Sequence, residues 1–122
     1  MAFFGGPPKD VLLQTARGIA VTAMQVQMVA ASEGEAKKHA IENLKAQGIP
    51  INVFDLALLV AEVVSEQNMG WVKKNQFVGM IHGSLLAMGM PPDDASNMKG
   101  VIEQAIQTRS RVEKGFRKIH GE

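Results

Sequence analysis

The chain has 122 residues, the size of one domain, and 46% of them are apolar, which is enough for a hydrophobic core. Its formal net charge of +1 creates no global field toward nucleic acid or a membrane surface. The absence of cysteine excludes disulfides, iron–sulfur clusters and thiolate zinc sites, and it favours a cytoplasmic protein.

The sequence predicts neither a signal peptide nor a membrane-spanning helix. Its first residues contain no basic region followed by a long apolar stretch. The most apolar runs are interrupted by Arg17, by Asp55 with Glu62, and by His82, so none reaches about 18 uncharged apolar residues. Scarce aromatic residues also argue against a sheet-rich fold.

Residues 1–8 predict a flexible N-terminal arm, because the Gly-Gly-Pro-Pro sequence before residue 9 cannot continue a helix. Two interpretations of this arm stay open. It is either a frayed chain end, or a segment whose Phe3 and Phe4 dock on a neighbouring subunit. The second interpretation is supported because two adjacent aromatic side chains gain little from staying in water.

The first helix is expected from Pro8 to Ala31, with Asp10 in its first turn, where the helix dipole favours a negative charge. Apolar residues recur at helical spacing and cover more than one face. A helix this apolar normally has neighbours on several sides.

A second, amphipathic helix is expected from residue 32 to residue 47. Ser32 followed by Glu35 matches a capping box, in which both side chains satisfy amides of the first turn. Gly48 suits the position after the helix end, and Pro50 prevents continuation. The residues expected to face inward are Ala36, Ala40, Ile41 and Leu44.

The third helix is expected to begin at Asn52, a good N-cap residue, and to end near residues 68–70. Its many β-branched residues also permit a buried strand. We favour a helix because of the cap, the length, and the seven-residue spacing of Asp55 and Glu62, which places both acids on one stripe.

The fourth helix is expected over residues 70–88, ended by Gly89 and by the two prolines that follow. Gly79 and Gly83 lie four residues apart on one of its faces. Each interior glycine costs about 1 kcal/mol of helix stability relative to alanine, so tight packing or a bend should offset it.

The fifth helix is expected from residues 92–94 to Ile119, with Asp93 and Asp94 at its positive end. A heptad pattern with one charged member follows, and it predicts an apolar stripe suited to self-association. The stripe comprises Met98, Ile102, Ala105, Arg109, Val112, Phe116 and Ile119.

The end of this helix, residues 109–120, is basic, and it has two interpretations. It is either a solvated helix end that complements the dipole, or a helix that contacts phosphates weakly and without sequence readout. The residues that would contact phosphates are Arg109, Arg111, Lys114, Arg117 and Lys118.

Residues 32–65 contain the elements GEAKKHAIENL, QGIPI and an apolar helix with spaced acids. Together they resemble the cytosolic helical segment of LL-H-type phage holins. That family places a membrane-spanning segment upstream of this region, and the present sequence contains none. The resemblance therefore implies a phage or prophage origin rather than a holin function.

No catalytic, cofactor-binding or metal-binding constellation is predicted. His39, His82 and His120 lie in three different expected helices without partners at ligand spacing, so each is read as a hydrogen-bonded interior or boundary histidine. Asp93 and Asp94 are read as a helix start rather than as a metal site.

We therefore predict an all-α protein, a single domain of about five helices in a short bundle with the third helix central. The expected apolar surface exceeds what one subunit can bury, which predicts a homo-oligomer or another protein partner. Self-association is expected through the first helix or through the stripe of the fifth. The function expected is a non-enzymatic assembly protein, structural or adaptor, cytoplasmic or virion-associated. The alternative is a nucleic-acid-associated protein that uses the basic helix end.

Overall fold

The computed structural model describes residues 7–119, with side chains as far as Glu113. Five α-helices and no strand occur in this part of the chain, which confirms the all-α prediction. Each helix begins and ends within a few residues of its expected position. The helices are α1 (Lys9–Ala31), α2 (Gly34–Ala46), α3 (Val53–Glu66), α4 (Trp71–Ala87) and α5 (Pro92–Ile119).

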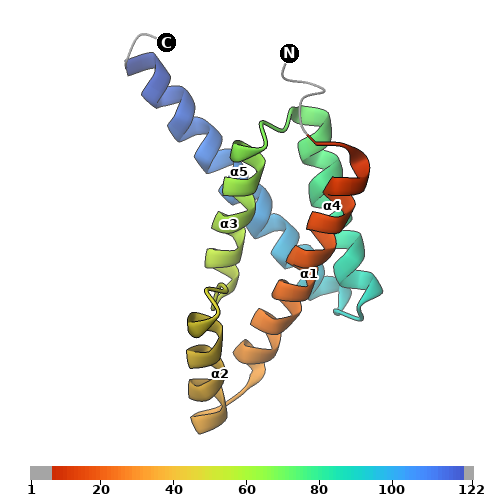
Figure 1. The fold of residues 1–122 in the computed structure, drawn as a ribbon, viewed down its shortest axis with the longest axis vertical. Helices are drawn as coiled ribbons and strands as arrows, with labels where there is room; N and C mark the ends of the chain where they lie inside the picture. Colours follow the sequence, from red (N-terminus) through yellow and green to blue (C-terminus); the bar gives the residue numbers. More distant parts are fainter. Residues whose placement is uncertain (1–6, 120–122) are drawn as a thin grey trace.

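The helices form a bundle with two extensions (Figure 1). α3 packs against both α5 and α1, the central position that the sequence predicted, and α1 also packs along α4. α5 crosses behind α3 in this view and continues well past the bundle. At the opposite end, α2 folds back on the last turns of α1 and forms a second projection.

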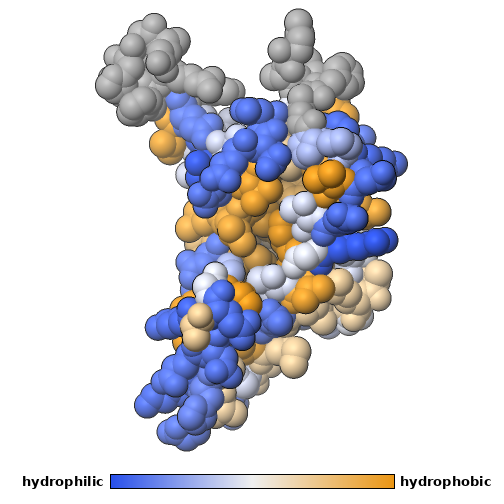
Figure 2. All heavy atoms as spheres, viewed as in Figure 1, coloured by the Kyte–Doolittle hydropathy of each residue, from blue (hydrophilic) through white to orange (hydrophobic). Residues whose placement is uncertain are grey.

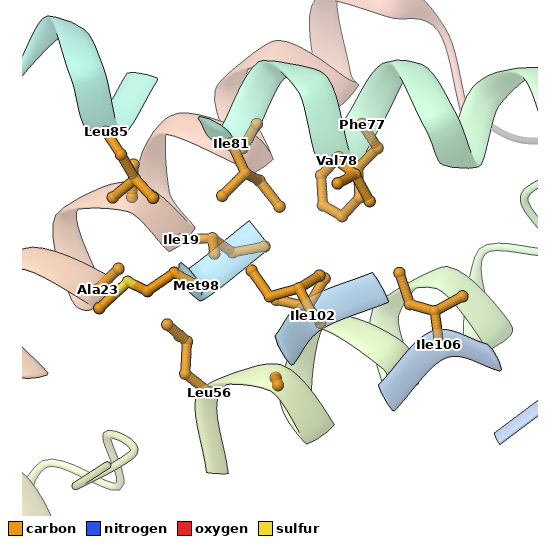
Figure 3. Packing of buried hydrophobic residues seen from close by; sticks show 14 of the residues in the cluster. Ile19, Ala23, Leu56, Phe77, Val78, Ile81, Leu85, Met98, Ile102 and Ile106 are labelled. Atoms are coloured by element: carbon orange, nitrogen blue, oxygen red, sulfur yellow. The ribbon is translucent and has the colours of Figure 1, made fainter. Parts of the chain in front are cut away.

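The hydrophobic core is built by four helices, α1, α3, α4 and α5. Figure 3 shows their side chains pointing toward one another around Ile102 of α5, with Phe77 and Ile81 of α4 on one side and Leu56 of α3 on the other. All four of these side chains are almost completely buried. α2 contributes no residue to this cluster. Its one buried side chain is Leu44, and its main packing contact is a short one with α1.

Three helices end in the same hydrogen-bonded turn. Gly48, Asn68 and Gly89 have positive φ and directly follow the C-caps of α2, α3 and α4. In each case the amide of the next residue bonds to a carbonyl five positions back, as in a Schellman motif. These bonds are Ile49 N to Leu44 O, Met69 N to Val64 O, and Met90 N to Leu85 O, at 2.9, 3.1 and 3.0 Å.

The cap predicted for α3 is confirmed. The side-chain oxygen of Asn52 accepts a hydrogen bond of 2.8 Å from the amide of Asp55. This bond satisfies one of the amides that the first turn of any helix leaves without an internal partner. The segment that could also have formed a strand is therefore helical from Val53.

The capping box predicted for α2 is wrong. α2 begins at Gly34, and its N-cap is Glu33, which makes no side-chain cap bond. Ser32 instead follows the last residue of α1, and its hydroxyl donates to the carbonyl of Val29 at 2.7 Å. The serine thus completes the end of α1, where carbonyls lack helical partners.

Two further expectations about packing are corrected. Ala36 of α2 is exposed, and the main contact of α2 with the bundle is a short one with α1. Gly79 and Gly83 of α4 are also exposed, and a Cβ atom added at either would meet nothing within 4 Å. Close packing within the described chain therefore does not explain either glycine.

Candidate functional site

The outer face of α3 carries large apolar side chains that the bundle leaves in contact with solvent. Phe54 is 74% exposed and Leu58 is 57% exposed, and Leu59 on the same helix is also exposed. Phe54 and Leu58 are one helical turn apart and form one stripe. Figure 2 shows apolar side chains over α3 and toward α1, whereas α2 is almost entirely hydrophilic.

This stripe forms one wall of a long groove between α3 and α5. The groove has a volume of about 1240 Å³, and it begins beside the turn that joins α2 to α3. Small and medium side chains of α5 form the opposite wall. The lining residues from α5 that matter below are Gly100, Val101, Gln104, Ala105, Thr108 and Val112.

The charges of the groove are unevenly placed. Asp55 and Glu62 line it from α3, and both are exposed. The two acids, which their seven-residue spacing placed on one stripe, thus both face solvent along the groove. At the far end, Ser65 Oγ and Arg109 Nε both donate to Glu113 Oε1, at 2.7 and 3.1 Å. This network joins the end of α3 to α5.

The predicted self-association stripe of α5 is divided by the fold. Met98 and Ile102 fill the core of their own chain and offer no surface to a partner. Ala105 lines the groove and is partly buried, and Val112 lines it with 66% of its surface exposed. The other residues predicted for self-association lie outside the described side chains: Phe3, Phe4, Phe116 and Ile119.

The predicted phosphate contacts are only partly described. Arg109 forms an ion pair of 3.1 Å with Glu113 of the next helical turn. Arg111 is exposed. Lys114, Arg117 and Lys118 lie beyond the last described side chain, although the helical backbone itself continues to Ile119.

Among the described residues, no group of His, Asp and Glu could hold a metal ion. His39 is exposed, and His120 is outside the described part. The Nε2 atom of His82 is buried without a hydrogen-bond partner among the described residues, so the hydrogen bond expected for this side chain is not found. Asp93 and Asp94 lie in the first turn of α5, as predicted. Asp94 also accepts a 3.1 Å hydrogen bond from Gln27 of α1.

The sequence analysis missed Phe54, Leu58 and Leu59 as surface residues. It predicted a central third helix and named no apolar surface on it. A signal was present, because Asp55 and Glu62 mark the solvent side of the helix, and Phe54, Leu58 and Leu59 flank these acids at helical spacing.

Comparisons with protein-family models, with curated proteins and with solved structures found no match to this chain. No helix in residues 7–119 is both long and apolar enough to cross a membrane. The site is therefore defined by its own geometry, an apolar groove with an acidic wall.

Proposed function

We propose that this protein is a non-enzymatic assembly component, structural or adaptor, which forms homo-oligomers through the groove between α3 and α5. One observation carries the proposal. Phe54, Leu58 and Val112 are large apolar side chains, each more than half exposed, and all three line the same groove.

The energetics favour coverage of this surface. Full burial of a Phe or Leu side chain contributes about 1.5–3 kcal/mol. Burial of two such side chains therefore contributes up to about 3–6 kcal/mol toward covering the groove. Asp55 and Glu62 do not oppose coverage, because exposed carboxylates at a rim can keep their water or meet a cation.

The holin-like segment supports one part of the proposal, a phage or prophage origin. Residues 32–65 form α2, the turn after it and nearly all of α3, so the apolar wall of the groove lies within this segment. In the proposal, this two-helix segment serves as an assembly surface in the cytoplasm or in a virion.

The test is the mass of the purified protein in solution, measured by light scattering and sedimentation over a range of concentrations. We expect the wild-type chain to exceed its monomer mass of 13.2 kDa. The double variant Phe54→Gln and Leu58→Gln should shift toward monomer, because glutamine keeps the helix but removes the apolar surface.

A matched control is available on α1, where Val21 and Met28 are exposed but do not line the groove. Val21→Gln with Met28→Gln should leave the mass unchanged, and circular dichroism should show equal helix content in both variants. A wild-type chain that is strictly monomeric at tens of micromolar contradicts the proposal, as does an equal effect of the two variants.

The nucleic-acid alternative has weaker support, because Arg109 is already paired with Glu113. Its support is the exposed Arg111 on a helix that projects past the bundle (Figure 1). Binding of duplex DNA that weakens steeply with salt, and is abolished by Arg111→Glu with Lys118→Glu, would favour this alternative.

A further inference from the structure

We propose that the groove is occupied by the C-terminal end of α5 from a second copy of the chain. The two copies exchange these ends around a two-fold axis that passes close to Val112. This inference rests on the proposed function, and it specifies which segment of the partner fills the groove.

The first argument is the continuity of one apolar stripe. Val112 lines the groove and is largely exposed there. Phe116 and Ile119 follow it by four and seven residues, so a helix that continues to Ile119 places all three on one stripe. A helix end with such a stripe needs an apolar surface to cover it, and the groove is such a surface.

The second argument is length. Seven residues separate Val112 from Ile119, which corresponds to about 10 Å of helix. On the opposite wall, the exposed stripe from Phe54 to Glu62 spans about 12 Å. The end of α5 is therefore long enough to lie along most of this wall.

The third argument is charge. α3 contains Asp55, Glu62 and Glu66 and no lysine or arginine, so its side chains carry three negative charges. Residues 109–120 contain five cations and one carboxylate, a net charge of four positive. An amphipathic helix with cationic flanks thus complements the groove wall, and this complementarity should favour correct encounter and register.

The two-fold arrangement follows from α5 contributing both partners of the contact. In an isologous interface, residue i meets residue j and residue j meets residue i. With the axis near Val112, α5 packs antiparallel to its copy. Ala105 then faces Ile119 of the partner subunit, and Thr108 faces Phe116 of the partner subunit. Each pair places a small side chain of the groove against a large one, which suits close packing.

Cysteine cross-linking tests this arrangement directly, because the natural chain contains no cysteine. The full-length variant Val112→Cys should form a disulfide-linked dimer under mild oxidation, since the axis brings the two copies of this position within bonding range. The control is Met28→Cys on α1, which is equally exposed but does not line the groove. It should remain uncross-linked at the same protein concentration.

Charge exchange provides a second, independent measurement. Asp55→Lys with Glu62→Lys, or Arg117→Glu with Lys118→Glu, should each raise the dimer dissociation constant by about tenfold or more. All four changes together should restore it to within about threefold of wild type, because opposite charges again meet. Loss in both pairs without recovery in the combination contradicts the exchange of helix ends.

The outcomes separate this inference from the function on which it rests. A strictly monomeric wild-type chain contradicts both the proposed function and the exchange of α5 ends. An oligomer in which Val112→Cys does not cross-link overturns the α5 exchange alone. If that oligomer is also dissociated by Phe3→Ser with Phe4→Ser, the N-terminal arm, rather than α5, occupies the groove.

Discussion

Glycines in α4 and just after it show how the effect of one residue type depends on its backbone conformation. Gly79 and Gly83 lie inside the helix on its exposed side, with open space where a Cβ would be. Gly89 follows the helix and has a φ of +97°, which L-residues rarely adopt. The first two glycines weaken the helix, whereas the third is required by the turn.

We therefore expect Gly79→Ala with Gly83→Ala to raise the free energy of unfolding, by about 1–2 kcal/mol for the pair. The reason is the lower backbone entropy of alanine in the unfolded chain and the absence of any clash in the helix. Urea denaturation followed by circular dichroism measures the change. A decrease would mean that a partner packs closely on this face.

Gly89→Ala is the control for this prediction. It should lower the free energy of unfolding by about 1–2 kcal/mol, because alanine is strained in the left-handed region. If all three substitutions had the same sign, backbone conformation would not be the cause.

At the scale of elements, helix ends determine where each segment stops and how it turns. The ends of α2, α3 and α4 share one hydrogen-bond pattern, and in each the residue after the turn is apolar. Two of these turns use glycine and the third uses Asn68 at a φ of +50°. Asparagine tolerates this region better than other side chains, so the α3 end keeps the same geometry.

The start of α3 offers a test of local capping. Asn52→Ala removes the acceptor for the amide of Asp55 and should lower the free energy of unfolding by about 1 kcal/mol. Asn43→Ala, at an exposed position inside α2, is the matched control and should change it by less than about 0.5 kcal/mol. Thermal and urea denaturation should both show the larger loss of stability for Asn52→Ala. An equal loss in the two variants would contradict the capping role.

For the whole molecule, the main feature is a core shared by four helices and a groove left between two of them. Ile102 contacts the core from α5 and is 1% exposed. α3 and α5 bury their facing sides against each other and against α1 and α4, and this packing leaves the outer stripe of α3 uncovered. The same packing that stabilises the monomer therefore creates the candidate interaction surface.

Truncation of the core tests the four-helix arrangement. Ile102→Ala should lower the free energy of unfolding by about 2–5 kcal/mol, because a cavity opens where the helices meet. Val21→Ala on the exposed side of α1 should change it by less than about 0.5 kcal/mol. A single cooperative transition is expected for both, and a small effect of Ile102→Ala would contradict its central position.

Local sequence was sufficient to predict the helices themselves. The cap at Asn52, the turns at Gly48 and Gly89, and the acids at the start of α5 were predicted from neighbouring residues, and the structure confirms them. The capping box at Ser32 was wrong because the same motif could also serve the preceding helix end, and local sequence does not distinguish the two.

Residues a few positions apart were enough to predict the helices, their ends and the excess of apolar side chains, because capping and periodicity are local. Which apolar side chains remain on the surface depends instead on how the helices pack. Met98, Ile102 and Val112 belong to one heptad pattern, yet the first two are buried and the third is exposed. The cause is the crossing of α5 behind α3 and the extension of α5 past the bundle (Figure 1), since burial depends on contacts between segments far apart in the chain.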